Sequence, residues 1–365
     1  MLACGIAAPA APAAAAPCAP WPDYAAFMAR YLSADGRVLD ADSARHVTVS
    51  EGEAYALLFA LVARDERRFA RIAGWTADNL AGGDLARRLP AWQWGRRDDG
   101  SYGVLDDNSA ADADLWLAYD LLEAGRLWHR AGYRATGRAL AARILAEETA
   151  DVTGLGRVLL PGAHGFGVEG GWRLNPSYLP LEVLRRLARA ADPGYRALAA
   201  SAAAAIAASA PHGFVPDWIV FRAAGGTAPD PVAGARGSYD AVRVYLWAGM
   251  LAPADPARQR LLALLAPMAR AVAGRGAPPA SIDAAAGSAA GTGPPGFSAA
   301  LVPFLASAGE WRAAARERRR AGHVADPGSG YYDDALRLFG LGWAEGRFRF
   351  GTAGELVVRR GPACA

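Results

Sequence analysis

Lysine is absent from the 365-residue sequence, so all 39 of its basic residues are arginines. The formal net charge is only +3, well short of the basic excess that is typical of nucleic-acid-binding proteins. Short basic runs such as RERRR (316–320) have helical spacing and fit solvated helix faces. The sequence therefore does not indicate a nucleic-acid partner.

Long apolar runs are also missing, since no stretch reaches the roughly 20 apolar residues that span a bilayer. We therefore expect no membrane span in the mature chain. The first twenty residues are apolar, alanine-rich and uncharged, like the end of a secretory signal, although they lack a basic start and contain several prolines. We interpret residues 1–20 as a leader remnant and expect a periplasmic or secreted protein with a single domain over residues 21–365.

Helical periodicity dominates this domain. Segments with a period near 3.6 residues predict helices over 22–33, 50–64, 66–81, 111–131, 132–149, 176–191, 193–210, 237–251, 255–275, 297–307, 309–322 and 329–343. They come in pairs, and short and long connections alternate between them. This pattern favours an all-α (α/α)6 toroid, in which six helical hairpins close into a ring and long loops form a groove on one face. A helical protein of two domains is the alternative, but no linker-like segment divides the chain.

Cysteine and histidine are scarce. Of three cysteines, Cys4 lies in the leader, whereas Cys18 and Cys364 bracket the domain. In a closed ring the first and last helices are neighbours, so we expect these two cysteines to form a disulfide, which suits an oxidising compartment. The five histidines are His46, His129, His164, His212 and His323, and their spacing is not that of metal ligands, so we expect no metal. We expect no other cofactor either.

The long connections are rich in glycine, proline, aspartate and aromatic residues. Trp92, Trp94, Trp172 and Trp218 all fall in them, beside polar side chains rather than in helix stripes. Flat aromatic faces flanked by short polar groups suit sugar rings, whose faces are apolar and whose rims form hydrogen bonds. The alternative is that these tryptophans only pack the loops together. Four of them in such loops make a sugar-binding groove the better hypothesis.

Two carboxylates open the stretch SEGEAYALLFA at 50–60. Ser50 and Glu53 have the spacing of a capping box, and Glu51 then fits a first-turn acid favoured by the helix dipole. Gly52 does not fit this structural reading, because glycine inside a helix costs about 1 kcal/mol relative to alanine. We therefore expect a glucan chain or another packed helix to approach the backbone beside Glu51.

A second acidic pair opens the segment SAADADLWLAYDLLEAGRLW at 109–128. This segment resembles the signature of glycoside hydrolase family 8, in which Ala-[Ser/Thr]-Asp-[Ala/Gly]-Asp begins an alanine-rich helix that ends on an aromatic residue. Asp112 and Asp114 match the two aspartates of the pattern. The sequence departs from it by Ala111 for Ser/Thr, Leu117 for Ile/Met and Asp120 for Ser/Ala.

Three further segments carry the resemblance in the same order. SEGE is similar to the family's Ser-Glu-Gly segment, LNPSYLP to its Asn-Pro-Ser-Tyr segment and GSYDAVRVYLW to its Tyr-Asp-Ala-x-Arg segment. The likeness covers most of residues 21–364. Within the family, LPAWQWG, DLLEAGRLW, GFVPDW and GPPGFSAALVPFL resemble the periplasmic endoglucanases of bacterial cellulose-synthesis operons.

The resemblance implies roles for individual residues. Glu51 would be the general acid, Asp240 the general base, and Asp112 would hold the distorted sugar at the cleavage point. Further substrate contacts implied by the same segments, together with the aromatic loops, are Asn175, Tyr178, Tyr239, Arg243, Tyr331 and Tyr332.

The implied function is an inverting endo-β-1,4-glucanase that acts on nascent or amorphous cellulose during cellulose synthesis and export. Its expected partners are β-1,4-glucans, with the synthase and export complex as a further candidate. Chitosan, xylan or mixed-linkage glucan are alternative substrates, since the family includes those activities. A glucan-binding export factor with incidental activity is the alternative from another class, although all three carboxylates that hydrolysis needs are present.

Overall fold

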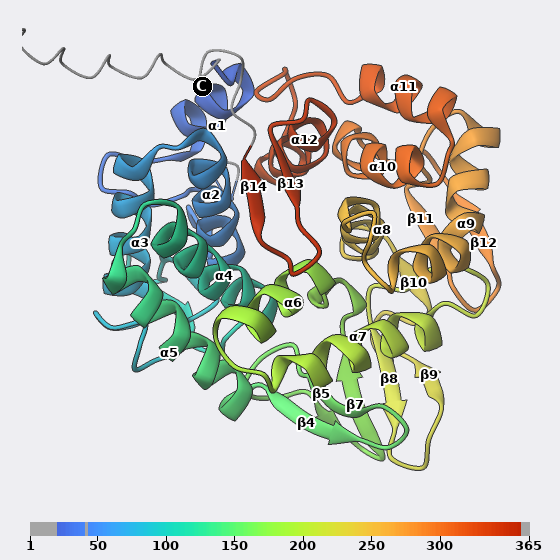
Figure 1. The fold of residues 1–365 in the computed structure, drawn as a ribbon, viewed down its shortest axis with the longest axis horizontal. Helices are drawn as coiled ribbons and strands as arrows, with labels where there is room; N and C mark the ends of the chain where they lie inside the picture. The colour runs from blue at the N-terminus through green and yellow to red at the C-terminus, as the bar shows by residue number, and fades with distance from the viewer. Residues whose placement is uncertain (1–19, 41–42, 359–365) are drawn as a thin grey trace, which may run out of the picture.

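The computed structural model describes residues 20–40 and 43–358, and every segment predicted as a helix is helical in it. One set of six helices consists of α2 (Ser50–Ala63), α4 (Ala111–Leu127), α6 (Leu181–Ala190), α8 (Ala241–Met250), α10 (Pro295–Ser307) and α12 (Tyr331–Ala344). A second set alternates with it along the chain: α1 (Pro22–Tyr31), α3 (Glu66–Leu80), α5 (Ala131–Glu147), α7 (Tyr195–Ser209), α9 (Arg258–Arg275) and α11 (Trp311–Arg320). Figure 1 shows the first set nearer the centre and the second set outside it.

Successive helices of the first set pack on one another. Contacts join α2 to α4, α4 to α6, α6 to α8, α8 to α10 and α10 to α12, and each of α2, α4, α6, α8 and α10 also packs on the helix that follows it. The series returns to its beginning, because the ring of Phe339 in α12 lies 4.9 Å from that of Phe59 in α2. One hydrophobic cluster with members from Trp21 to Leu356 fills the interior.

Short strands form much of the long connections, which the sequence analysis had treated as irregular loops. β1 (Thr48–Val49), β2 (Gln93–Arg96) and β3 (Tyr102–Asp106) form one sheet. A second sheet contains β6 (Gly167–Val168), β7 (Gly171–Leu174), β8 (Ile219–Arg222) and β9 (Thr227–Pro229), and a third contains β10 (Arg236–Gly237), β11 (Ser281–Asp283) and β12 (Ser288–Ala290). Two-stranded sheets pair β4 (Thr149–Val152) with β5 (Gly156–Leu159) and β13 (Phe348–Phe350) with β14 (Leu356–Val358).

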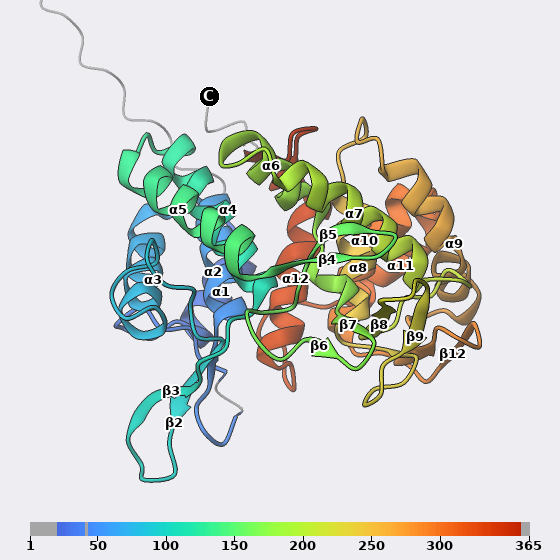
Figure 2. The same cartoon turned by 90° about the horizontal axis from the view of Figure 1, so that it is seen from below.

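The two ends of the helix array differ in their connections. Only residues 64–65 join α2 to α3, and residues 128–130 join α4 to α5, whereas the strand-bearing connections lead into the N termini of α4, α6 and α8. Figure 2 shows the β2–β3 hairpin projecting from the same side as β6, β9 and β12. The expectation that long loops gather where inner helices begin is therefore confirmed.

The predicted capping box at Ser50 and Glu53 is wrong. The N-cap of α2 is Val49, which makes no side-chain capping bond, and the Ser50 hydroxyl is buried without a hydrogen-bond partner in the part of the chain that the structure describes. Glu53 instead accepts hydrogen bonds from the backbone N–H of Val38, at 2.7 Å, and from the hydroxyl of Thr76, at 3.2 Å. Both partners lie outside α2, so local spacing alone could not identify them.

Two helices begin later than predicted for physical reasons. Residues 176–178 form a separate 3-10 turn, η1 (Pro176–Tyr178), and α6 starts after Pro180. Before α8, the carboxylate of Asp217 accepts backbone N–H bonds from Ser238, Asp240 and Ala241 at 2.7, 3.1 and 2.8 Å. A side chain from another loop therefore satisfies donors that helix starts leave unpaired.

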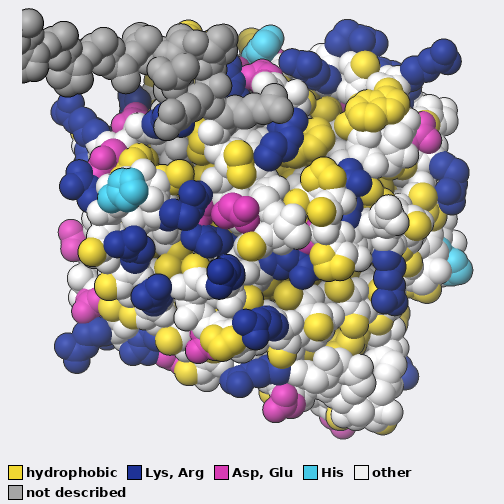
Figure 3. Space-filling view, viewed as in Figure 1, with side chains coloured by type: hydrophobic (Ala, Val, Ile, Leu, Met, Phe, Trp, Pro, Cys, Tyr) yellow, Lys and Arg dark blue, Asp and Glu magenta, His cyan; other side chains and the backbone are white. Residues whose placement is uncertain are grey.

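The ends of the described chain meet at one place. Pro20 and Val358 line the same cavity, while Cys18 and Cys364 lie outside the described residues. Figure 3 shows arginine side chains scattered over the face that bears β13 and β14, interspersed with apolar and uncharged groups. In the described part of the chain, no helix has both the length and the apolar character required to cross a bilayer.

Candidate active site

Three carboxylates converge where inner helices begin. Glu51 lies in the first turn of α2, Asp112 in the first turn of α4, and Asp240 directly precedes α8. One guanidinium connects two of them: a terminal nitrogen of Arg243 is 2.9 Å from Asp240 Oδ1 and 3.5 Å from Asp112 Oδ2. The structure therefore brings together the acidic residues that the sequence singled out.

Asp240 is held from two sides. The side-chain amide of Asn175 donates to Oδ2 at 3.0 Å, and Arg243 donates to Oδ1 at 2.9 Å. Its side chain is 30% exposed. A carboxylate that is oriented at both oxygens yet open to water has the geometry of a general base.

Arg243 is itself fixed by its surroundings. It is 4% exposed and donates to the Ser177 hydroxyl at 2.8 Å. The aromatic rings of Tyr178 and Tyr332 lie 5.6 and 6.0 Å from the guanidinium carbon. A cation held in this way can set the distance between two carboxylates without moving itself.

Glu51 has the environment of a proton donor. Burial raises the pKa of its carboxyl group, the backbone hydrogen bond at the helix start and the charge of Arg243 lower it, and the charge of Asp240 raises it. The net direction is upward. One carboxyl oxygen is buried and makes no hydrogen bond among the described residues. Burial therefore outweighs the helix N terminus, which favours the ionised form.

Asp112 is more deeply buried, at 2% exposure. Burial and then the charge of Glu51 raise the pKa of Asp112 well above its usual value, whereas Arg243 lowers it. Its Oδ1 accepts the backbone N–H of Ala113 at 2.9 Å, and no described group donates to its Oδ2. That oxygen lies 3.5 Å from the Arg243 guanidinium and can accept a hydrogen bond from a hydroxyl group of a substrate.

Tyr331 approaches the backbone at Gly52. A Cβ added to Gly52 would lie 2.7 Å from the Tyr331 hydroxyl oxygen and 3.7 Å from a methyl group of Val38. Tyr331 is 8% exposed, and its ring packs against Tyr31 at 5.5 Å between centres. Of the two expected occupants, a glucan chain or a packed helix, it is a packed helix that approaches Gly52, because Tyr331 opens α12.

The other predicted tyrosines line the same region. The Tyr332 hydroxyl donates to the backbone carbonyl of Tyr239 at 2.6 Å, and the two rings lie 6.0 Å apart. Tyr239 is 53% exposed and also packs edge-on against Phe297. Its exposed ring is available to a ligand, whereas the ring of Tyr331 is nearly buried and packs against Tyr31.

None of the four loop tryptophans is fully buried. Trp218 adjoins Tyr178, with 6.0 Å between the ring centres, and it stacks on Phe166 at an interplanar angle of 3°. Trp92 adjoins Glu51 through the backbone, because its carbonyl accepts the N–H of Ser50 at 2.9 Å.

The remaining two tryptophans lie in strands of the loop sheets. Trp94 belongs to β2, where it stacks on Tyr102 at 5.4 Å and lies 4.3 Å from the Arg37 guanidinium carbon. Trp172 belongs to β7 and pairs with Phe221 of β8. In the described part of the chain, neither of them forms a hydrogen bond with any of the three carboxylates.

Sequence reasoning missed three residues of this site: Ser177, Asp217 and Tyr55. Ser177 and Asp217 lie within the quoted segments LNPSYLP and GFVPDW, so both could have been named. Tyr55 lies one helical turn after Glu51, on the same face of α2, which is a signal that spacing provides. Burial raises the pKa of Tyr55 well above its usual value, and its hydroxyl is buried without a partner among the described residues.

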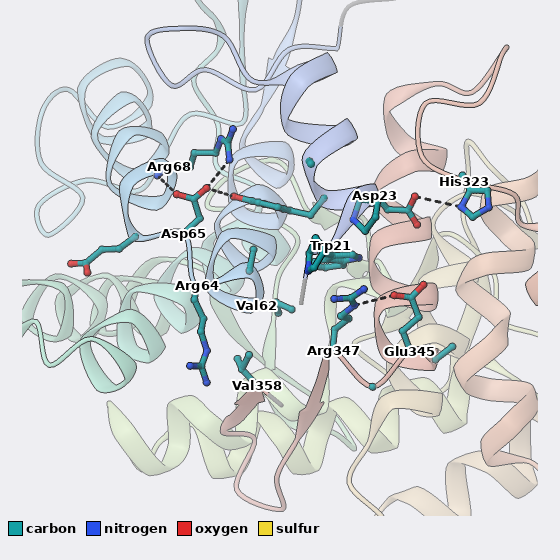
Figure 4. Close-up of a pocket in the computed structure, with 18 of the residues that line it drawn as sticks. Trp21, Asp23, Val62, Arg64, Asp65, Arg68, His323, Glu345, Arg347 and Val358 are labelled. Atoms are coloured by element: carbon teal, nitrogen blue, oxygen red, sulfur yellow. Dashed lines mark hydrogen bonds and ion pairs between the residues drawn. The ribbon is translucent and has the colours of Figure 1, made fainter. Parts of the chain in front are cut away.

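A large cavity lies at the opposite end of the helices. Its volume is about 1430 Å³, and Val62 and Arg64 are among the residues that line it. These two residues follow Glu51 by 11 positions or more, so they lie at least about 16 Å from Glu51 along the axis of α2. Figure 4 shows that several of its charged groups pair with each other, as in Asp65 with Arg68 and Glu345 with Arg347, whereas Arg64 is drawn without such a partner. The cavity thus offers no set of free carboxylates comparable to that at the strand-bearing end.

Comparisons with known proteins agree with this geometry. Residues 4–346 match the family model described as Glycosyl hydrolases family 8. The endoglucanase of Salmonella typhi is 45% identical over 345 residues, covering 94% of this chain and 92% of the relative. That of Xanthomonas axonopodis pv. citri (strain 306) is 46% identical over 368 residues, covering 100% and 94%.

Solved structures give the same result. The crystal structure of endo-1,4-D-glucanase from Vibrio fischeri ES114 superposes with a TM-score of 0.85 at 40% identity, covering 93% of this chain and 99% of that one. The endo-β-1,4-glucanase CMCax of Acetobacter xylinum superposes with a TM-score of 0.74 at 28% identity, covering 89% and 98%. The motifs, the arrangement of the three carboxylates and these matches agree: the chain belongs to glycoside hydrolase family 8.

Proposed function

We propose that the chain is an inverting endo-β-1,4-glucanase in which Glu51 is the general acid and Asp240 the general base. The observation that carries this proposal is the pairing of a partly buried carboxyl, one oxygen of which is buried and whose pKa is raised, with a 30% exposed carboxylate that two side chains orient. Inverting hydrolysis needs these two different environments, one to keep a proton and one to remove it from water.

The chemistry follows from these positions. The Glu51 carboxyl donates its proton to the glycosidic oxygen as the bond from that oxygen to the anomeric carbon breaks. Asp240 takes a proton from a water molecule, whose oxygen bonds to the anomeric carbon on the opposite face. Glu51 ends ionised and Asp240 protonated, and the new chain end has the α configuration. Asp112, with its free oxygen and nearby Arg243, is suited to hold a sugar hydroxyl as positive charge develops on the ring.

The fold supports a groove for a long chain. We assign the twelve helices to an (α/α)6 barrel and residues 21–365 to a single catalytic domain, because successive helix pairs pack in series and one hydrophobic cluster extends through them. Trp92, Trp218 and Tyr239 expose aromatic surface near the carboxylates, which suits the apolar faces of glucosyl rings.

The natural substrate follows from the relatives. Proteins named endoglucanase or endo-1,4-glucanase match most of this chain, so we propose β-1,4-glucan in nascent or amorphous form, cleaved in the periplasm or outside the cell during cellulose synthesis and export. Contact with the synthase and export machinery is part of this proposal.

The test is hydrolysis of a panel of soluble polymers, with the first product followed by proton NMR. We expect fastest cleavage of a β-1,4-glucan and initial release of the α-anomer. Faster cleavage of chitosan, xylan or mixed-linkage glucan would reassign the substrate. Binding of glucan without hydrolysis would favour an export factor, and initial release of the β-anomer would overturn Asp240 as base.

A further inference from the structure

Two buried carboxyl groups lie behind the three at the active site. Asp114 follows Asp112 by two residues in α4, and Glu148 is the C-cap of α5; both are 0% exposed. A side-chain hydrogen bond between them raises the pKa of Asp114 and lowers that of Glu148, and no other described group donates to either oxygen of Asp114 or to Oε2 of Glu148. Neither takes part in an ion pair within the described part of the chain. Because a hydrogen bond between two carboxyls requires a proton, and no cation compensates a second negative charge, the pair keeps one proton, and it carries one negative charge once the pH exceeds the pKa of Glu148.

The surroundings of the pair are consistent with a single charge. Burial raises the pKa of Glu148 to about 7, with hydrogen bonds from Ser109 and Asp114 acting in the opposite direction. The other titratable groups that act on the pair are Glu147 beside Glu148, and Asp112 and Glu51 near Asp114. Tyr195 of α7 also faces the pair, and its hydroxyl donates to the carbonyl of Ala141. None of them is a cation.

Glu148 anchors the loop that leads into α4. The Ser109 hydroxyl donates to Glu148 Oε1 and accepts the backbone N–H of Ala163 at 3.0 Å. The N–H of Ala111 donates to the carbonyl of Pro161 at 2.9 Å. The pair thereby joins the start of α4 to the loop that follows β5, immediately beside Asp112.

The same anchor continues to the start of α2. The carbonyl of Asn108, the neighbour of Ser109, accepts the N–H of Trp92 at 2.8 Å, and the carbonyl of Trp92 accepts the N–H of Ser50 at 2.9 Å. Ser50 directly precedes Glu51. A continuous path of hydrogen bonds and peptide units therefore runs from Glu148 to the residue that carries the proposed acid.

We propose that Asp114 and Glu148 form a positioning pair, which shares one proton, anchors the loops that present Glu51 and Asp112, and keeps one negative charge behind them. This inference rests on the proposed function for its kinetic consequences. The interaction between Asp114 and Glu51 is mutual, so the retained charge also favours the protonated form of the acid.

Three variants separate anchoring from charge. Asp114→Asn keeps the shape and can donate to an ionised Glu148, so the charge is retained. The double variant Asp114→Asn with Glu148→Gln keeps the shape but removes the charge. Asp114→Ala removes the contact. The control is Asp120→Asn on the same helix, because Asp120 is also 0% exposed and the charged group that acts on it is Glu123 rather than an active-site residue.

The pH profile of kcat on a soluble β-1,4-glucan distinguishes these effects. We expect the alkaline limb, which reports ionisation of the acid, to stay in place for Asp114→Asn and for Asp120→Asn and to move to lower pH in the double variant. Asp114→Ala should lower kcat by on the order of 10- to 100-fold, because small displacements of catalytic groups have effects of that size. An unmoved limb in the double variant, or wild-type kcat in Asp114→Ala, would overturn the proposal.

A second readout does not depend on activity. Infrared spectra of the wild-type protein at a pH well above the pKa of Glu148 should contain one carboxylic-acid band and one carboxylate band that the double variant lacks. If the wild-type protein cleaves no glucan but this difference is present, the proposed function fails and the proton-sharing pair stands. If the protein cleaves glucan and the difference is absent, the pair fails alone.

Discussion

The hydroxyl group of Tyr331 occupies the space that a side chain at residue 52 would need, since a Cβ there would lie 2.7 Å from its oxygen. Tyr331 cannot withdraw easily, because its ring packs between Tyr31 and Phe27 at 5.5 and 6.0 Å. Glycine is therefore required at the residue next to Glu51 for packing, despite its cost to the helix.

Replacement of Gly52 by alanine should destabilise the protein. We expect Gly52→Ala to lower the free energy of unfolding by about 1 to 3 kcal/mol, the usual cost of overpacking, and to lower kcat because Glu51 moves with the backbone. Gly74 in α3 is the matched control, since a Cβ there meets nothing within 4 Å. Gly74→Ala should raise the free energy of unfolding by about 0.5 to 1 kcal/mol in urea denaturation. Equal effects of the two substitutions would contradict this account.

Asp120 offers a prediction about pH. Both of its carboxyl oxygens are buried without a partner among the described residues, and burial, followed by the charge of Glu123, raises its pKa well above the usual value. The folded state then binds this proton more tightly than the unfolded state, so its contribution to stability is present at low pH and declines as pH rises above about 4.

Removal of that carboxyl should therefore stabilise the protein at neutral pH. We expect Asp120→Ala to raise the free energy of unfolding by about 1 kcal/mol or more at pH 7 relative to wild type, with a smaller gain near pH 4. Denaturation at several pH values measures the difference, and Asp78→Ala at an exposed position of α3 is the control. A gain that does not grow with pH would show that Asp120 is ionised or paired in the folded state.

Trp218 is the loop tryptophan whose ring contacts Tyr178 beside the carboxylates, and it is only partly buried. The Arg173 guanidinium lies over one face of the ring, with its carbon 3.9 Å from the ring centre, and the Phe166 ring lies parallel to it at 6.1 Å between centres, so a sugar would contact the part of the ring that these two groups leave open. We expect Trp218→Ala to weaken cello-oligosaccharide binding about tenfold, or ~1.4 kcal/mol, in calorimetry on a catalytically inactive background. Trp311 of α11 is the control, because it is 69% exposed and lies on an outer helix. If Trp311→Ala has the same effect, the contribution is not specific to the groove.

The disulfide between Cys18 and Cys364 stays a prediction, now with a structural argument. Pro20 and Val358 line one cavity. Pro20 lies two positions after Cys18, and Val358 lies six positions before Cys364, so the two chain segments together can span about 25 Å. We expect an exported sample to contain the Cys18–Cys364 peptide pair by mass spectrometry without reduction. Its loss on Cys364→Ser should lower the free energy of unfolding by about 2 to 5 kcal/mol. Recovery of both thiols free would contradict it.

The sequence predicted the helices well because their signal is local and repeated. α4 and α5 are 17 residues long, and periodicity over that length is hard to mistake. The strands were missed because they are short; β2 and β3 have four and five residues and are joined through a turn that contains Asp99 and Gly100. An aspartate–glycine turn between aromatic residues is a hairpin signal that could have been used.

The active-site residues that lie in sequence motifs could be predicted. Their hydrogen-bond partners from distant parts of the chain could not. Glu51, Asp112 and Asp240 were identified from their segments, but nothing in the local sequence shows that Asp217 caps α8 or that Glu53 binds Val38. Such bonds join residues more than ten positions apart, so only tertiary structure reveals them. The same holds for Tyr331, which explains Gly52 from a distance of 279 positions in the chain.

The division of labour between Glu51 and Asp240 can be tested with two isosteric variants. Glu51→Gln keeps the shape but cannot donate a proton, so hydrolysis of unactivated glucan should fall by on the order of 10²- to 10⁴-fold, while a substrate with an acidic leaving group is partly spared. Asp240→Asn should impair both substrates, because water must be activated whatever group leaves. Steady-state rates on a glucan and on an aryl cello-oligoside measure the contrast.

Folding and binding provide the control for this pair. Neither variant should lose the fold, and both should bind cello-oligosaccharides, because binding relies on the aromatic loops rather than on these carboxyls. Asp240→Asn should also leave Arg243 in place, since Ser177 and Asp112 still hold the guanidinium. Wild-type activity of Glu51→Gln would show that Glu51 is only a first-turn acid of the helix. Equal losses of activity on both substrates in Glu51→Gln would contradict its role as the proton donor.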